Sequence, residues 1–373
     1  MRIGINARRL EGQPLGVARY IEYLLRHWSQ MLGDDERASL YVREPLPDER
    51  VPSDDRYSVE VVTPRLSGFA WENLRLPLAI RDVDVFFGPS YSLPLPYRGR
   101  TVVAIHSVNE VQKGAHQWWY PWTYPRLYRA SARKADRVIV PSQSVKRDLQ
   151  EAYEIGDDRI VVVPQGVDGD FCRVEDEELL ARTRVEQLGE DRPYVVFVGK
   201  LSLRRNIPML MRAFARAVGR GRELPHKLLL FGPNHQGVPI AELAEELGIG
   251  DRVIQTDGVL KDHHDLTRIY SAADAYVSAS EYEGFSMTAV EAMACGTPVV
   301  GVARAAFGEI VDGAGHLVDE PSVEGLAEAL HDVLTDPELR RTMQARGIER
   351  AARFRWEDVA RDTLDVLREV SSE

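Results

Sequence analysis

The stretch SEYEGFSMTAVEAMACGTPVV, residues 280–300, carries the order strand, loop, helix and strand that decides the fold. An apolar run at Ala275–Ser278 comes directly before it and predicts a buried strand. Gly284 permits a sharp turn of the backbone after that strand. The following residues, Met287–Cys295, predict a helix that ends at Gly296.

Two glutamates flank the predicted start of this helix, Glu283 before it and Glu291 inside it. Ser286 or Thr288 can cap the helix with a side-chain hydroxyl. The first backbone amides of a helix have no partner within it, and they favour a bound anion. This layout suits a ligand that carries a phosphate with hydroxyls on both sides of it, as a nucleotide sugar does.

The bulk composition narrows the class of protein. A chain of 373 residues, 44% of them hydrophobic, predicts two ordinary globular domains. The net charge of −11 argues against non-specific binding to nucleic acid. The two cysteines, Cys172 and Cys295, are too few for a disulfide framework or a cysteine metal cluster. Met1–Leu10 lacks the apolar segment of a signal peptide, and no run is long enough to span a bilayer, so we expect a cytoplasmic protein.

Short apolar strands alternate with helical stretches along both halves of the chain. Such alternation indicates a parallel sheet with helices on both faces, and its repetition predicts two doubly wound domains. We place the crossing between them near Gln165–Asp170. The expected strands are Arg2–Asn6, Ser39–Val42, Ser58–Val62, Val83–Phe87, Thr101–Ile105, Arg137–Val140, Ile160–Val163, Tyr194–Val198, Leu228–Phe231, Ala275–Ser278 and Val299–Val300.

The stretch 280–300 resembles the donor-site signature of the retaining glycosyltransferases of family 4, the sucrose-synthase and glycogen-synthase-like group 1 glycosyltransferases. The resemblance is densest there and extends over nearly the whole chain. It implies an α/β protein with the GT-B fold, in which two doubly wound, Rossmann-like domains face each other and the C-terminal helix crosses back to the first. The implied domains are 1–168 with about 355–373 on the acceptor side, and 169–354 on the donor side.

The resemblance also implies roles for residues of the second domain. Glu291 is expected to bind the ribose hydroxyls, and Glu283 to bind the donor sugar and stabilise positive charge on its ring. Lys200 and Arg205 are expected to neutralise the departing diphosphate. Arg205 stands where the family usually has a lysine, and an arginine can fork onto two phosphate oxygens. Further donor contacts are expected from Gly199, Gly232, Gly284, Phe285, Ser286, Met287 and Thr288.

Two features of the first domain resemble the same family. His106 follows the predicted strand Thr101–Ile105, where the family has a His-Asp pair close to the donor sugar; here Ser107 replaces the aspartate. A histidine at a strand end can donate a hydrogen bond to a sugar hydroxyl or orient a phosphate. Gly16 lies in the loop before the first helix and would let the backbone approach the ligand.

Aromatic and basic residues gather in Gln117–Arg137, which contains three tryptophans and three tyrosines followed by five cations. Three interpretations stay open for this segment. It can contact a lipid headgroup layer, form a sugar-stacking acceptor cleft, or be a buried aromatic plug with a solvated basic helix. Aromatic residues with cations also suit single-stranded nucleic acid, but the rest of the chain gives that no support.

Taken together, these features predict a retaining hexosyltransferase that moves a sugar from a nucleoside diphosphate sugar, GDP- or UDP-linked, to a hydroxyl acceptor. Neither a metal nor another cofactor is expected, because two cations and a helix start can hold the diphosphate. Trp71–Pro77 resembles members that build bacterial surface polysaccharides with mannose, rhamnose or glucose, so we expect mannosyltransferase activity in polysaccharide biosynthesis. The acceptor can be a lipid-linked saccharide, met by peripheral contact with the inner face of the membrane.

Two other functions stay open at this point. The first is an isomerase of the same architecture, such as a nucleotide-sugar 2-epimerase, which would need different catalytic acids. The second is a non-catalytic subunit that binds sugar nucleotides; the positive charges retained at Lys200 and Arg205 argue against it.

Overall fold

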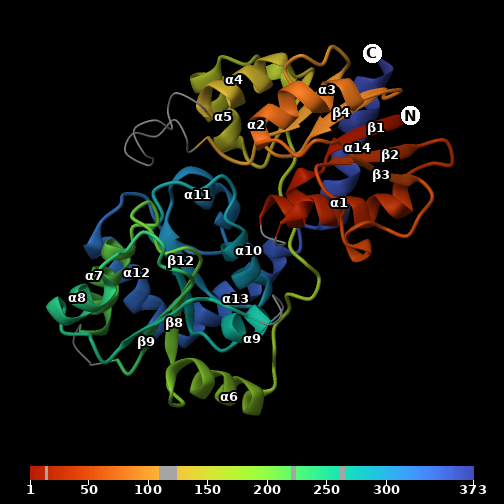
Figure 1. The fold of residues 1–373 in the computed structure, drawn as a ribbon. Coiled ribbons are helices and arrows are strands. Elements are labelled where there is room, and N and C mark those ends of the chain that lie inside the picture. Colours follow the sequence, from red (N-terminus) through yellow and green to blue (C-terminus); the bar gives the residue numbers. More distant parts are fainter. Residues whose placement is uncertain (13–15, 109–123, 220–223, 261–264) are drawn as a thin grey trace. The chain divides into compact units, whose positions relative to one another are not determined.

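The computed structural model describes residues 1–12, 16–108, 124–219, 224–260 and 265–373. The chain forms two compact units. Unit 1 consists of Met1–Gly166 together with Trp356–Glu373, and unit 2 consists of Val167–Arg355. Each unit is built around one parallel sheet, and Figure 1 shows the helices that cover it.

The sheet of unit 1 has seven strands in the order β3-β2-β1-β4-β5-β6-β7, all parallel. Its central strands are buried on both faces, which explains their unbroken apolar sequences. The strands are β1 (Arg2–Asn6), β2 (Arg37–Val42), β3 (Tyr57–Val61), β4 (Val85–Gly88), β5 (Thr101–Ala104), β6 (Arg137–Val140) and β7 (Ile160–Val162).

The described helices of unit 1 lie between its strands along the chain, except for α14, which follows unit 2. They are α1 (Val17–Met31), α2 (Gly68–Ala70), α3 (Leu76–Ala79), α4 (Tyr124–Lys134), α5 (Gln143–Tyr153) and α14 (Trp356–Ser372). Short 3-10 turns occur at η1 (Arg8–Glu11), η2 (Asp48–Arg50) and η6 (Asp157–Arg159), and a π-helical turn, η3 (Trp71–Arg75), joins α2 to α3.

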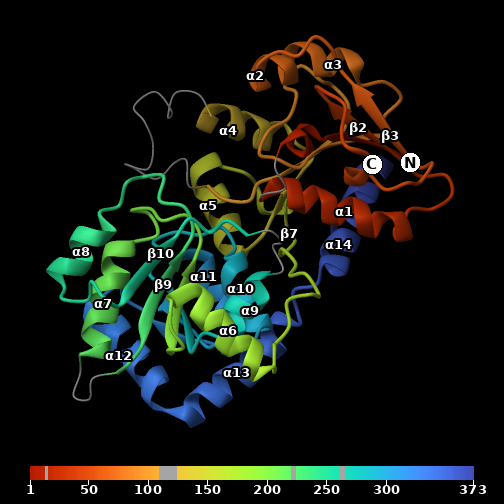
Figure 2. The same ribbon diagram turned by 60° about the horizontal axis from the view of Figure 1, so that its bottom comes forward.

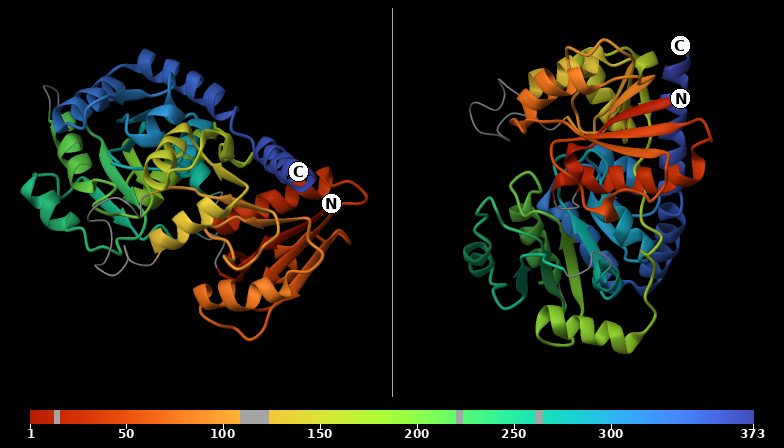
Figure 3. Two further views of the ribbon diagram at one scale, coloured as in Figure 1. Left: turned by 90° about the horizontal axis from the view of Figure 1, so that it is seen from above. Right: turned by 45° about the vertical axis from the view of Figure 1, so that its right-hand side comes forward.

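The last helix, α14, completes unit 1 although it is far from the rest of that unit in sequence. Figures 1 and 3 show it in dark blue beside the N-terminal strands in red. It packs on α1, where the indole Nε1 of Trp28 donates a hydrogen bond of 2.8 Å to the carbonyl of Ala360. Arg368 of α14 also forms an ion pair of 2.7 Å with Glu36. A buried hydrogen bond and a partly buried ion pair thus fix the helix to the first domain.

The sheet of unit 2 has six strands in the order β10-β9-β8-β11-β12-β13, again all parallel. The strands are β8 (Tyr194–Val198), β9 (Lys227–Phe231), β10 (Val253–Thr256), β11 (Ala275–Ser278), β12 (Val299–Val302) and β13 (His316–Val318). The helices are α6 (Glu177–Leu188), α7 (Ile207–Val218), α8 (Ile240–Glu246), α9 (Leu266–Ser271), α10 (Met287–Ala294), α11 (Ala305–Val311), α12 (Val323–Thr335) and α13 (Pro337–Ala351). Helices α7 and α12 lie side by side over one face of this sheet (Figure 2).

The fold class expected from the sequence is confirmed, with two doubly wound parallel sheets of the Rossmann type. The order of strands reverses between β1 and β4 in unit 1, and between β8 and β11 in unit 2. In such sheets ligands bind at the carboxyl ends of the strands on either side of this reversal. Helix α7 starts at Ile207, and Pro208 lies in its first turn, where a proline fits a helix.

Three glycines touch one another where β8, β9 and β10 end. Gly199 and Gly232 have φ values of 137° and 149°, a region that side chains disfavour. A Cβ on Gly232 would lie 2.0 Å from the carbonyl oxygen of Gly199, and a Cβ on Gly258 would lie 2.7 Å from the Cα of Gly232. The three loops therefore pack backbone against backbone and leave no volume for a side chain at Gly232.

We predict that Gly232→Ala destabilises unit 2 by about 3 kcal/mol or more, because the added methyl overlaps the backbone of Gly199. The matched control is Gly313→Ala, where φ is also positive at 72° but the Cβ meets open space. That change should lower the free energy of unfolding by only about 1 to 2 kcal/mol, the cost of a left-handed conformation in a residue with a Cβ. Urea unfolding followed by circular dichroism measures both values, and equal losses in the two variants would contradict the steric argument.

Candidate functional site

The loops that follow β8 and β11 meet where the strand order of unit 2 reverses. Arg205, after β8, forms an ion pair with Glu283, after β11, through Nη1 and Oε1. The same Nη1 donates a hydrogen bond of 3.3 Å to the hydroxyl of Ser280. The Nε of Arg205 is buried and has no hydrogen-bond partner among the described residues. A cation and a carboxylate therefore lie side by side, with one guanidinium donor still available.

The ion pair controls the charge of Glu283. Its side chain is only 5% exposed, and this burial on its own raises the pKa of the carboxyl. The positive charge and hydrogen bond of Arg205 outweigh burial and hold the pKa below its ordinary value. Glu283 is therefore an ionised carboxylate at neutral pH, in a site from which most water is excluded.

The start of α10 differs from the predicted capping arrangement. Ser286 holds the N-cap position, but its φ of 85° is left-handed and its side chain accepts no hydrogen bond from the helix. Thr288 does not cap either, since its hydroxyl is bonded to the hydroxyl of Tyr276 at 2.9 Å. The left-handed residue of this loop is thus Ser286, whereas the sequence placed the sharp turn at Gly284. Without a side-chain cap, the first amides of α10, around Met287, can receive an anion.

Glu291 lies one turn into α10 and is 2% exposed. Its Oε2 accepts a hydrogen bond of 3.1 Å from the hydroxyl of Tyr270. Burial, and then the charge of Glu291, raise the pKa of Tyr270 well above its ordinary value, so this phenol stays protonated and continues to donate. The helix itself ends as predicted. Gly296 is left-handed at 69°, and the amide of Thr297 reaches back to the carbonyl of Ala292 at 2.9 Å.

Two further residues of unit 2 were predicted to contact a donor, Lys200 and Phe285. Lys200 directly follows Gly199 at the end of β8, and its side chain is exposed. No ion pair holds Lys200 within the parts of the chain that the structure describes. Phe285 is 4% exposed and meets the ring of Phe354 edge-to-face at 5.4 Å, so it belongs to the core of unit 2.

In unit 1, His106 lies just beyond β5 and both of its ring nitrogens are occupied. Nε2 lies 2.9 Å from the carbonyl oxygen of Pro89, and Nδ1 lies 3.0 Å from the amide nitrogen of Gln165. Burial is the main reason why its pKa falls to about 4. The imidazole is therefore neutral, donates through Nε2 and accepts through Nδ1. In this conformation it offers no free nitrogen to a sugar or phosphate, unlike the hydrogen bond expected from the sequence.

Gly16 and the aromatic segment complete the set of predicted positions. Gly16 is the N-cap of α1, with a positive φ of 52°. Residues 117–123 of the Gln117–Arg137 segment lie outside the described residues, as does His116. The described remainder forms α4 and the start of β6, and Tyr124 is 43% exposed at the beginning of that helix.

Comparison with known proteins identifies the family. The model of the Glycosyl transferases group 1 matches residues 181–350, and that of Glycosyltransferase Family 4 matches residues 15–171. The chain belongs to the group 1 glycosyltransferases. The resemblance that residues 280–300 suggested is therefore confirmed.

Curated relatives come from several bacteria. A D-inositol 3-phosphate glycosyltransferase of Salinispora tropica is 35% identical over 256 residues, which is 64% of this chain and 52% of the relative. One of Corynebacterium urealyticum is 33% identical over 247 residues, covering 63% of this chain and 57% of the relative. The match thus spans little more than half the length of these group 1 glycosyltransferases.

Solved structures share the GT-B fold with this chain. Sucrose-phosphate synthase from Thermosynechococcus elongatus superposes with a TM-score of 0.77 at 23% identity, covering 100% of this chain and 99% of the other. HepE of Anabaena, solved in complex with UDP and glucose, gives a TM-score of 0.77 at 19% identity, covering 99% of this chain and 100% of the other. At these identities the likeness establishes the fold alone.

Sequence reasoning missed a polar cluster in unit 1, where its own strand order reverses. Glu72 is completely buried and accepts hydrogen bonds from the amide of Asn6 at 2.8 Å and the hydroxyl of Ser92 at 2.9 Å. Arg8 lies 3.3 Å from the same carboxylate. Burial raises the pKa of Glu72 despite this cation. The adjacent arginines Arg8 and Arg9 after β1 were the signal in the sequence that could have pointed to this cluster.

Two further findings concern metals and membranes. Among the described residues, no group of three or more His, Cys, Asp or Glu side chains is placed to hold a metal ion. In the same part of the chain, no helix combines the length and the apolar character that a membrane crossing requires.

We predict that Arg205→Gln raises the pKa of Glu283 above its ordinary value of 4.5, because burial, the largest influence, is then opposed only by the hydrogen bonds of Ser280 and Ser286. In the unchanged protein the ionised carboxylate stabilises the fold above about pH 4.5, and this contribution is lost as pH falls through the depressed pKa. Removing the cation should lower the free energy of unfolding by about 3 kcal/mol at neutral pH. Carbon-13 NMR of the glutamate carboxyls measures the titration. The control is Arg216→Gln, which breaks an exposed pair with Glu324 and should leave Glu283 unchanged.

We also predict that His106 stays neutral until the pH approaches 4 and carries its proton on Nε2. Its pKa in the folded state lies below the ordinary 6.5, so the unfolded chain takes up a proton first and stability declines as pH falls from 6.5 towards 4. Nitrogen-15 NMR of the imidazoles reports the tautomer and the titration. A ring that titrates near 6.5 would refute this description.

Proposed function

We propose that the chain is a retaining glycosyltransferase, which moves a sugar from a nucleoside diphosphate sugar to a hydroxyl group of an acceptor. The observation that carries the proposal is the ion pair of Arg205 with Glu283 at the strand reversal of unit 2, next to the uncapped start of α10. One site there offers a cation and free amides for a diphosphate, and a buried carboxylate for the sugar. Membership of the group 1 glycosyltransferases supports the same reaction.

The donor is proposed to lie along this edge of unit 2. The amides near Phe285–Thr288 and the side chains of Lys200 and Arg205 take the diphosphate, and Gly199 and Gly232 allow its close approach. Glu291 accepts hydrogen bonds from the ribose hydroxyls, as it already does from Tyr270. HepE was solved with UDP and glucose, so UDP-linked sugars are the first donors to test and GDP-linked sugars the second.

The proposed reaction balances without a cofactor. The acceptor oxygen forms a bond to the anomeric carbon on the face from which the diphosphate departs, and the bond to the diphosphate oxygen breaks with its electron pair on that oxygen. The departing phosphate takes the acceptor proton, so the products are the glycosylated acceptor and the nucleoside diphosphate. Glu283 stabilises positive charge that develops on the ring, and Lys200 and Arg205 stabilise the negative charge on the leaving group. On this proposal two cations and a helix start do the work of a metal ion.

The acceptor is proposed to be a saccharide, free or lipid-linked, used at the cytoplasmic side of the membrane in the synthesis of a surface polysaccharide or glycoconjugate. Unit 1 would bind it, as the acceptor-side domain. For the sugar that is transferred, mannose is the first to test, because Trp71–Pro77 resembles members that build surface polysaccharides. The curated relatives are named for D-inositol 3-phosphate, so an inositol phosphate is a second acceptor class to test.

A donor-binding and turnover experiment tests this site. Glu291→Ala should abolish the thermal stabilisation produced by the best ligand in a panel of GDP-, UDP-, ADP- and dTDP-sugars, because the ribose loses its acceptor. Lys200→Ala and Arg205→Ala should each reduce kcat by about 100- to 1,000-fold. The control is Glu281→Gln, an exposed glutamate of the same loop, which should retain binding and turnover.

Two outcomes would count against the proposal. Near-normal activity in all three site variants would remove the site assignment. A nucleotide sugar that isomerises when incubated without any acceptor would identify an epimerase, since a transferase can at most hydrolyse it slowly.

A further inference from the structure

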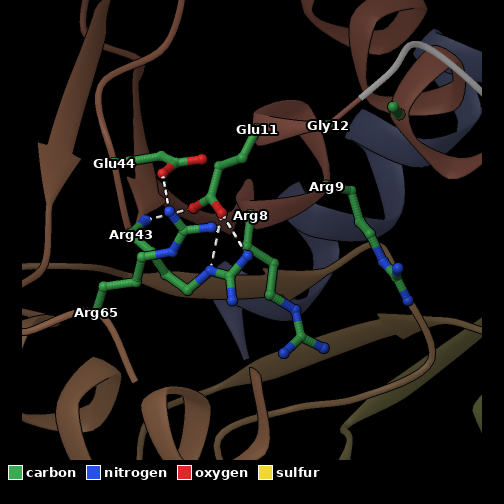
Figure 4. A pocket seen from close by; sticks show the side chains of 8 residues that line it. Arg8, Arg9, Glu11, Gly12, Arg43, Glu44 and Arg65 are labelled. Carbon is green, nitrogen blue, oxygen red and sulfur yellow. Dashed lines mark hydrogen bonds and ion pairs between the residues drawn. The ribbon is translucent and has the colours of Figure 1, made fainter. Parts of the chain in front are cut away.

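Unit 1 contains a pocket of its own, at the carboxyl ends of its first three strands. We name it the arginine pocket, after its lining residues Arg8, Arg9, Glu11, Arg43, Glu44 and Arg65. Its volume is about 460 Å³. The lining comes from the loops that follow β1, β2 and β3. Figure 4 shows Glu11, Arg43, Glu44 and Arg65 meeting, with Arg8 and Arg9 extending beside them. The loop after β1 also borders the reversal of strand order, where doubly wound sheets bind ligands.

The charges of the arginine pocket do not balance, because its lining contains four arginines and two glutamates. Arg43 forms an ion pair with Glu11 at 2.6 Å, and its Nε donates to the same carboxylate at 2.8 Å. Arg65 pairs with Glu44. In Figure 4 dashed lines mark these pairs. The two glutamates are therefore used by Arg43 and Arg65. Arg8 is paired with Glu72, which is not part of the lining of this pocket, so among the described residues the unmatched positive charge is that of Arg9.

Arg9 is the arginine best placed to bind a ligand. Arg8 is 14% exposed and is already held by Glu72 at 3.3 Å and by the carbonyl of Gly68 at 2.9 Å. Arg9 is exposed, and its Nε donates a hydrogen bond of 2.9 Å to the hydroxyl of Ser90. Among the described residues it forms no ion pair, so both terminal nitrogens of its guanidinium stay available. Ser90 fixes the direction of the side chain and leaves its fork unoccupied.

An aromatic hollow adjoins the arginine pocket and shares Arg8, Arg9 and Arg43 with it. This second pocket has a volume of about 300 Å³ and is lined by Phe69, Tyr124 and Tyr128 among others. Phe69 is 60% exposed and Tyr124 is 43% exposed. Exposed aromatic rings provide flat apolar faces that fit the apolar face of a sugar ring.

A chain of ring contacts leads from this hollow back to the end of β5. The distances between ring centroids are 5.9 Å for Tyr124 and Tyr128 and 5.1 Å for Tyr128 and Tyr91, which are stacked. The ring of Tyr91 in turn meets that of His106 edge-to-face, with centroids 5.5 Å apart. A ligand seated on the first rings would thus extend towards the carboxyl edge of the central strands. One molecule could thus contact the cations of the arginine pocket and the aromatic rings of the adjoining hollow at the same time.

We propose that the arginine pocket binds the phosphate group of a phosphorylated saccharide, whose sugar ring lies in the adjoining aromatic hollow. This inference rests on the proposed function, because it makes that molecule the acceptor. A guanidinium binds two oxygens of a phosphate at once through its parallel N–H groups. A phosphate also carries the negative charge that would balance Arg9, the one arginine of the lining without an ion pair among the described residues. The molecule can be free or the headgroup of a lipid, since both present the same phosphorylated sugar.

The test measures binding to the full chain by isothermal titration calorimetry. The probes are glucose 1-phosphate, methyl glucoside, glucuronic acid and vesicles that contain a polyprenyl glucosyl phosphate. Arg9→Gln should weaken the binding of glucose 1-phosphate by about tenfold or more, because charge-assisted hydrogen bonds are lost. Arg9→Lys, which keeps the charge without the fork, should give an intermediate loss. The control is Arg98→Gln, an exposed arginine of unit 1 outside both pockets, which should change the affinity less than about twofold.

The outcomes separate this proposal from the proposed function. Glucose 1-phosphate could also enter the donor site of unit 2, and its binding would then depend on Arg205 instead of Arg9. That result overturns the proposal, as does an affinity for glucose 1-phosphate that does not change in Arg9→Gln. Binding of glucuronic acid or methyl glucoside that is tighter than the binding of glucose 1-phosphate also overturns it. An Arg9-dependent affinity for glucose 1-phosphate or for the vesicles supports it, and the stronger of the two identifies the source of the phosphate. Failure of the proposed function is measured on a different ligand, since nucleotide sugars would then give no thermal stabilisation.

Discussion

The ion pair between Arg205 and Glu283 forms because β8 and β11 are neighbours in the sheet of unit 2. The two residues are 78 positions apart, and they meet because the strand order reverses between these strands. Two adjacent loops then leave the same edge of the sheet in diverging directions. The buried carboxylate of Glu283 stays ionised there because a cation lies beside it. The charge of the site therefore depends on the loop after β8, which carries Arg205, and on the strand order that brings this loop next to Glu283.

Much of this arrangement could be predicted from the sequence, because its elements have strong local signals. The strands are short, continuous apolar runs, and α10 ends at a glycine that adopts the required left-handed conformation. The capping at its start was predicted wrongly. Ser286 is a preferred capping residue, but it has a positive φ and its hydroxyl accepts no hydrogen bond from the helix amides. Local propensity therefore identified the helix, and tertiary geometry decided how it begins.

Contacts between distant residues were harder to anticipate. The sequence assigned Arg205 and Glu283 to different parts of a ligand, and no local pattern shows that the two side chains meet. His106 was interpreted from its position after a strand, yet its ring nitrogens are used by Pro89 and Gln165. The arginine pocket was missed altogether, because its members come from three separate loops and look like ordinary surface charges one by one. Such clusters become visible only when the strand order brings the loops together.

The attachment of α14 to unit 1 has a consequence for how the protein is made. Unit 2 is continuous in sequence, whereas unit 1 needs residues that the ribosome adds only after all of unit 2. Until then the surface of α1 around Trp28, and the faces of β4 and β5 that α14 covers, lack their partner. Unit 1 therefore cannot complete its folding until α14 has been synthesised, and before that it carries exposed apolar surface. The domain that begins first thus depends on residues that are synthesised after the second domain.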